Sequence, residues 1–169
     1  MAEANRDRIN PSLLDRLTDD APGVPASRGA WTTVSELRKS VLRDLTWLFN
    51  TTQTLYGEQS EDWPQVRNSV VNFGLPPLAG QTAASLEVMD LERAIRQAIV
   101  EFEPRILAGT LQVRALVESD HLDHHNVIGI EIHGQLWAQP VPLDLLIRTE
   151  IDLETGKVRV ADLASARSA

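Results

Sequence analysis

Apolar residues recur at helical spacing in two long stretches of the chain. Between residues 33 and 50 they repeat every three or four positions, which predicts an amphipathic helix that Thr33 or Ser35 can cap. The same spacing predicts another helix over 85–102. Each helix would bury one face and turn most of its charged residues towards water.

A shorter helix is expected between these two. Asp62 can cap it, and Pro64 suits a first helical turn. Val66, Val70 and Phe73 would lie on its buried side.

Beyond residue 110 the period of the apolar residues changes to two. Apolar and polar residues alternate over 111–117, 128–132, 143–153 and 158–160, as in strands that bury one face. Short connections between such strands favour antiparallel pairing. The predicted fold is therefore α+β, with three helices followed by a four-stranded, mainly antiparallel sheet.

Composition and charge limit what the chain can be. Its 169 residues suit a single domain, expected over 31–169, preceded by a flexible tail over 1–30. There is no cysteine, which excludes disulfides and cysteine nucleophiles and fits a reducing compartment such as the cytoplasm. A net charge of −8 argues against a general nucleic-acid binder. No apolar run has the length of a membrane helix or the form of a signal peptide, so membrane insertion is not expected.

The tail contains one short apolar motif. Leu13, Leu14 and Leu17 would share one side of a helix of one or two turns. A motif of this kind in a tail is typical of a peptide that docks on a partner. It could equally fold onto its own domain.

Glu103, Pro104 and Arg105 end the helix expected over 85–102. Proline cannot continue a helix, and it pushes the preceding residue out of helical geometry. A carboxylate and a guanidinium are therefore held together at a helix-to-strand corner. Two interpretations compete: Glu103 could be the acid catalyst of a muramidase-like glycoside hydrolase, or the pair could be a fixed polar clamp in an assembly.

Glycoside hydrolysis requires two carboxyl groups, about 5 to 9.5 Å apart. Glu150 and Asp152 have a suitable separation on one strand face, but charged residues that alternate with apolar ones are also what a half-buried strand predicts. The sequence offers Glu103 no convincing carboxylate partner. We therefore predict no catalytic residue.

Three histidines, His121, His124 and His125, lie between two predicted strands. Imidazole and carboxylate groups suit zinc. Their spacing matches no defined ligand pattern, and the Asp and Asn residues around them are ordinary turn formers. We predict no metal site and no cofactor.

The predicted sheet is interrupted after Leu136 and Trp137 by two prolines, Pro140 and Pro142. Proline removes donors from a strand ladder and confines this stretch to an edge or a corner. A free edge beside it could accept a strand from another chain. Leu136 and Trp137 are therefore candidate partner contacts.

Five blocks of sequence, in fixed order, carry a resemblance to a known family: 41–51, 69–76, 103–105, 134–137 and 149–156. They resemble the TssE family of baseplate subunits of the bacterial type VI secretion system. That family belongs to the wider group of phage-tail wedge proteins, sometimes labelled "lysozyme-like". The similarity extends from about Ser12 to Val160.

The resemblance implies structural work rather than catalysis. Members of the family sit in baseplate wedges, contact the other wedge subunits, and present a sheet to which contractile sheath subunits attach by strand exchange. It implies a cytoplasmic protein in a sixfold, membrane-docked baseplate. Glu103, Pro104 and Arg105 would then hold the helix–sheet corner or a partner surface.

Overall fold

A four-stranded antiparallel sheet is the centre of the computed structural model, which describes residues 11–18, 33–57, 61–79, 88–116, 127–138 and 140–163. The strands are β1 (Gln112–Leu116), β2 (Val127–Leu136), β3 (Leu143–Asp152) and β4 (Val158–Asp162), and they lie side by side in that order. The apolar alternation explains the register, because Ile132 lies opposite Ile147 and both are fully buried. The predicted α+β class and the four-stranded antiparallel sheet are confirmed.

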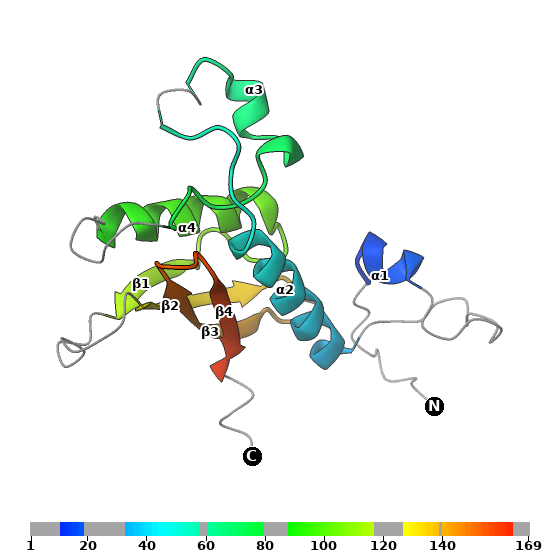
Figure 1. The fold of residues 1–169 in the computed structure, drawn as a ribbon. Coiled ribbons are helices and arrows are strands. Elements are labelled where there is room, and N and C mark those ends of the chain that lie inside the picture. The colour runs from blue at the N-terminus through cyan, green and yellow to red at the C-terminus, as the bar shows by residue number, and fades with distance from the viewer. Residues whose placement is uncertain are drawn as a thin grey trace, which may run out of the picture.

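Two long helices pack against the sheet (Figure 1). α2 (Val34–Phe49) packs along β4, and α4 (Val88–Phe102) packs along β1. Thr33 caps α2 in a capping box with Glu36, as one of the two predicted caps. Polar side chains such as Arg114, Glu150 and Arg159 are exposed on the sheet. No helix among the described residues combines the length and apolarity needed to cross a membrane.

The predicted tail helix is present as α1 (Leu13–Leu17), capped by the Ser12 hydroxyl. It stands beside α2 in Figure 1, and none of its residues is buried. The described residues therefore hold four α-helices before the sheet. The rest of the predicted tail, 1–10 and 19–30, lies outside the described residues.

The prediction of one short helix from Pro64 to Phe73 is wrong in detail. The chain forms one α-turn, α3 (Pro64–Arg67), and then a 3-10 turn, η2 (Val70–Asn72). The Ser69 hydroxyl accepts a hydrogen bond from the Val71 N–H, and such local side-chain bonds compete with a continuous helix. Val70 is 82% exposed, not buried. The residue at the α3 cap is Trp63, not Asp62, and it makes no side-chain cap bond.

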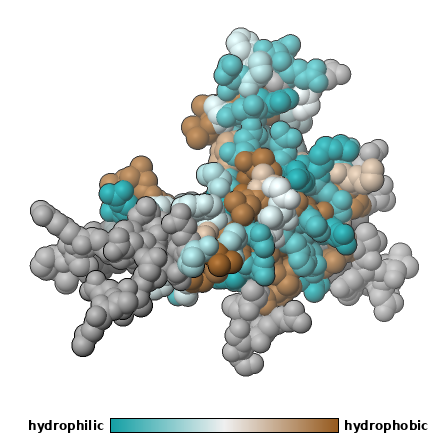
Figure 2. All heavy atoms as spheres, turned by 180° about the vertical axis from the view of Figure 1, so that it is seen from behind, coloured by the Kyte–Doolittle hydropathy of each residue, from teal (hydrophilic) through white to brown (hydrophobic). Residues whose placement is uncertain are grey.

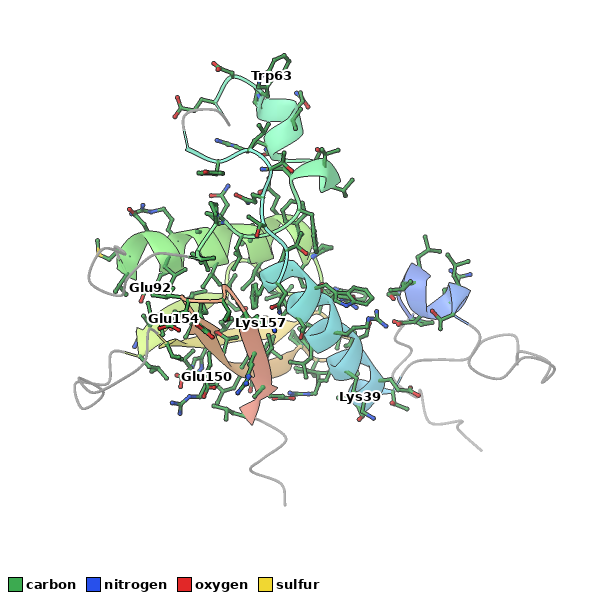
Figure 3. The ribbon with its side chains drawn as sticks, in the orientation of Figure 1. Lys39, Trp63, Glu92, Glu150, Glu154 and Lys157 are labelled. Atoms are coloured by element: carbon green, nitrogen blue, oxygen red, sulfur yellow. The ribbon has the colours of Figure 1, made fainter. Side chains whose placement is uncertain are left out.

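α3 and η2 form a lobe that stands away from the sheet (Figure 1). Figure 3 shows Trp63 at its tip. Asn72 ties the lobe together from inside: its side-chain oxygen accepts the Leu55 N–H at 2.8 Å, and its amide nitrogen donates to the Leu55 carbonyl at 3.1 Å. Asn72 is only 1% exposed. The lobe is therefore anchored by a buried polar side chain rather than by an apolar face.

Candidate functional site

The chain turns from α4 towards the sheet at Glu103–Arg105. Pro104 stops the helix, as predicted from its missing N–H. The Arg105 carbonyl then accepts a hydrogen bond from the Trp137 N–H at 2.7 Å, just beyond the end of β2. Two regions singled out in the sequence, the Glu-Pro-Arg tripeptide and Trp137, therefore meet in the structure.

The Arg105 guanidinium joins the end of α4 to α2. Its Nε and Nη2 atoms donate to the two carboxylate oxygens of Glu103, at 2.7 and 2.5 Å. Nη2 also donates to Asp44 at 2.5 Å, and Nη1 donates to the Ser40 hydroxyl at 2.9 Å. Burial lowers the pKa of Arg105, but the bonds and charges of Glu103 and Asp44 outweigh it, so the net shift of this pKa is upward.

α1 joins the same network through Asp15. The Asp15 carboxylate accepts from Arg43 at 2.6 Å and from Ser40 at 2.9 Å, and Arg43 also donates to Asp44 at 2.9 Å. Burial alone would raise the pKa of Asp15, but bonds from Ser12, Arg43 and Ser40 lower it to about 2. The five charged groups, Asp15, Arg43, Asp44, Glu103 and Arg105, are called the corner network below.

An apolar groove of about 460 Å³ opens beside the corner network. Trp47 on its wall is 51% exposed, and the Arg43 guanidinium lies 5.2 Å from the centre of the Trp47 ring. Phe73 and Phe102 meet edge to face, with ring centres 5.2 Å apart. The other lining residues are Ser12 and Leu14 at α1, Leu45 and Leu48 on α2, Pro104, and the network residues Asp44, Glu103 and Arg105.

The corner network supplies the second carboxylate that the sequence did not reveal. Glu103 and Asp44 each have an oxygen 2.5 Å from the same Arg105 nitrogen, so these oxygens lie at most twice that distance, 5.0 Å, apart. A retaining glycosidase needs a similar separation, but with space for the sugar between the groups. Here the Arg105 guanidinium fills that space. The geometry therefore favours the polar clamp over the acid catalyst.

The other candidate partner contacts divide into exposed and buried residues. Leu13, Leu14 and Leu17 are exposed on α1, whose surface in Figure 2 is partly brown and partly teal. Trp137 is 51% exposed. Leu136 differs from the expectation: it is fully buried, because the alternation of β2 turns it into the core. Its side chain is not part of the surface.

The remaining sequence candidates do not join the corner network. Asp152 stabilises the turn after β3, because its carboxylate accepts hydrogen bonds from the Thr155 hydroxyl at 2.7 Å and from the backbone N–H groups of Glu154 and Thr155. These bonds lower the pKa of Asp152, and the bond from the Thr155 hydroxyl has the largest effect. Glu150 is exposed on the sheet. The histidines at 121, 124 and 125 lie outside the described residues. Within the described ranges, no three His, Cys, Asp or Glu side chains gather as a metal site would require.

Sequence reasoning missed four members of this site: Asp15, Ser40, Arg43 and Asp44. Arg43 and Asp44 lie three and four positions after Ser40, which places both of them next to Ser40 on one face of α2. Only that spacing could have indicated a polar face, because the partners on α1 and beyond α4 are distant in the chain.

The comparisons with known proteins identify a family. Residues 35–141 match the family described as "Baseplate wedge protein gp25". Neither the curated proteins nor the solved structures include a match to the chain. The matched residues contain α2, the lobe, α4, the Glu-Pro-Arg corner and β2, and they make up more than half of the chain. The chain therefore belongs to the gp25 family of baseplate wedge proteins.

Proposed function

We propose that this protein is a structural subunit of a type VI secretion baseplate, where it binds other wedge subunits and starts assembly of the contractile sheath. Its membership of the baseplate wedge family supports the structural role. The observation that carries the proposal is the corner network. It joins α1, α2 and the end of α4, and the Arg105 backbone joins them to β2. Such cross-bracing suits a part that holds partner surfaces in a fixed orientation.

The surface around the corner network suits a protein partner. Trp47 and Trp137 are both about half exposed, and Leu13 and Leu17 on α1 are more exposed still. Large apolar side chains gathered at a surface mark interaction sites, and tryptophan often carries much of the binding energy of an interface. We infer that other wedge subunits bind here.

We propose that sheath subunits attach by strand addition at an edge of the sheet, although both edges are short and partly covered. β1 and β4 are only five residues long, and a helix side chain covers part of each edge. Glu92 on α4, beside β1 in Figure 3, accepts the Ala115 N–H at 2.7 Å. Asn50 binds the Val158 N–H at 3.0 Å and the Val158 carbonyl at 2.9 Å. These side-chain bonds discourage unwanted strand pairing. A strand from a sheath subunit would pair with the backbone groups of an edge strand that the Glu92 and Asn50 side chains leave uncovered.

A baseplate subunit of this kind has a defined cellular setting. It acts in the cytoplasm, within a sixfold baseplate docked at the membrane, without crossing the membrane itself. It binds no nucleic acid, needs no metal or cofactor, and catalyses no reaction.

Co-purification tests this function. The tagged chain is co-expressed with the wedge and sheath subunits encoded with it, and we expect those wedge subunits to be captured. Trp47→Ala and Trp137→Ala should weaken capture. Met89→Ala, which removes a large apolar side chain that is 69% exposed in the first turn of α4, away from the corner, should not. If the tagged, folded chain captures none of these subunits, the proposed function is wrong.

A further inference from the structure

The charges of the corner network do not balance. Asp15, Asp44 and Glu103 bring three carboxylates, whereas Arg43 and Arg105 bring two guanidinium groups. One negative charge is therefore left over in the corner network, and three of its members, Asp44, Glu103 and Arg105, line the apolar groove. Unbalanced charge beside an apolar surface favours a partner group of opposite sign.

At the groove, the free hydrogen-bonding capacity lies mainly on the carboxylates. Arg105 already makes four side-chain bonds, to Glu103, Asp44 and Ser40. A carboxylate can accept about four hydrogen bonds. Asp44 accepts two from the described residues, one from Arg43 and one from Arg105, and its side chain is 27% exposed. An incoming donor therefore finds acceptor sites at Asp44. Arg105, the arginine that lines the groove, has only one of its five N–H donors left for an incoming carboxylate.

The groove adds an apolar requirement. Its walls are aromatic and aliphatic, from Trp47, Phe73, Phe102 and Leu14, and its volume of about 460 Å³ suits one or two side chains. We propose that this groove binds a segment of a partner protein in which an apolar side chain fills the aromatic part and a neighbouring lysine or arginine reaches Asp44. This rests on the proposed function, because it describes the partner that the wedge protein would take at the same site.

Small probes test the inference on the purified chain alone. The probes are 3-phenylpropylammonium, 3-phenylpropanol and 3-phenylpropionate, which share an apolar body and differ in charge. Binding is followed by the NMR shift of the Trp47 indole N–H. We expect the ammonium probe to bind about fivefold more tightly than the alcohol, the size of one partly exposed charge pair, and the carboxylate to bind most weakly.

Two variants and one control separate the causes. Asp44→Asn should remove the preference for the ammonium probe. Trp47→Ala, which leaves the corner network intact and is followed through the Arg105 Nε–H signal, should weaken all three probes. Glu150→Gln removes the same charge from an exposed position on the sheet and should change nothing.

Equal binding of the three probes, a preference for the carboxylate, or no shift at all would each overturn the inference. Retention of the ammonium preference in Asp44→Asn would do the same. None of these results bears on co-purification of wedge subunits, so the inference can fail while the proposed function stands.

Discussion

Replacement of Arg105 by alanine should destabilise the protein, because Arg105 is the charged partner of a buried carboxylate, Glu103. The Glu103 side chain is only 4% exposed, and Arg105 provides both of its side-chain hydrogen bonds. Without the guanidinium, Glu103 keeps only the backbone N–H of residue 105, at 3.2 Å. A buried carboxylate left in this state has lost the charge that compensates for its desolvation.

The expected cost follows from this burial. Breaking a buried ion pair by removing one partner costs about 3 to 5 kcal/mol of unfolding free energy. We expect about 3 kcal/mol for Arg105→Ala, the lower end, because the Arg105 and Asp44 side chains are 23% and 27% exposed and water can reach them. A domain of this size should then lose about 6 to 12 °C in melting temperature.

Urea denaturation followed by circular dichroism measures this loss, provided that the slope of free energy against urea stays unchanged. The control is Arg93→Ala: Arg93 pairs with Asp90 on the exposed face of α4, with side-chain exposures of 69% and 58%. That substitution should cost below about 1 kcal/mol.

A double variant tests whether charge is the cause. Glu103→Gln with Arg105→Met removes both charges and should cost less than Arg105→Ala alone, since no carboxylate is left unpaired. Equal costs for Arg105→Ala and Arg93→Ala would refute the reasoning, because Glu103 would then be well solvated. A double variant as unstable as Arg105→Ala would show that packing, not charge, sets the loss.

Three further predictions concern other parts of the fold. Asp15→Asn should free α1 and speed tryptic cleavage after Arg16 while leaving global stability within about 1 kcal/mol. In the wild type, the pKa of Asp15 is lowered from 3.8 to about 2. The contribution of Asp15 to the docking of α1 is therefore complete above about pH 4 and is lost as the pH falls through 2. Proteolysis by an acid-active protease at a series of pH values would measure this loss. Asn50→Ala should cost about 1 to 2 kcal/mol of unfolding free energy and speed hydrogen exchange at the Val158 amide. Unchanged exchange at Val158 would contradict the proposal that Asn50 covers this edge of the sheet. Gly74→Ala should cost several kcal/mol of unfolding free energy, because φ is +132° and a Cβ would lie 2.3 Å from a backbone oxygen. Gly57→Ala has open space around the new Cβ and should cost about 1 kcal/mol. Comparable urea midpoints for these two variants would be inconsistent with the clash at Gly74.

The sheet and the long helices were predictable because their burial is periodic. Ile128, Ile130 and Ile132 alternate with Gly129, Glu131 and His133 in β2, and all three isoleucines are buried. A period of two or of 3.6 is a local property, so it can be read without knowing what each face packs against.

The lobe was mispredicted because no periodic apolar face holds it. Its conformation depends on Asn72 and on bonds to Leu55, which lies 17 positions earlier in the chain. The apolar spacing of Val66, Val70 and Phe73 imitated a helix face, but Val70 points to solvent. A four-residue helix is too short for spacing to identify its buried side.

The Glu-Pro-Arg corner combines a predictable position with an unpredictable partner. Pro104 ends α4 by local stereochemistry, so the corner could be located from sequence. The contact with Asp44 spans 61 positions, and no local rule could foresee it. Because of that contact, bracing the helix–sheet corner and binding a partner are not mutually exclusive roles for the corner network. Glu103 is buried and braces the fold, whereas Asp44, in the same network, remains partly exposed at the groove. A partner cation bound at Asp44 would therefore act directly on the bonds that hold the helix–sheet corner.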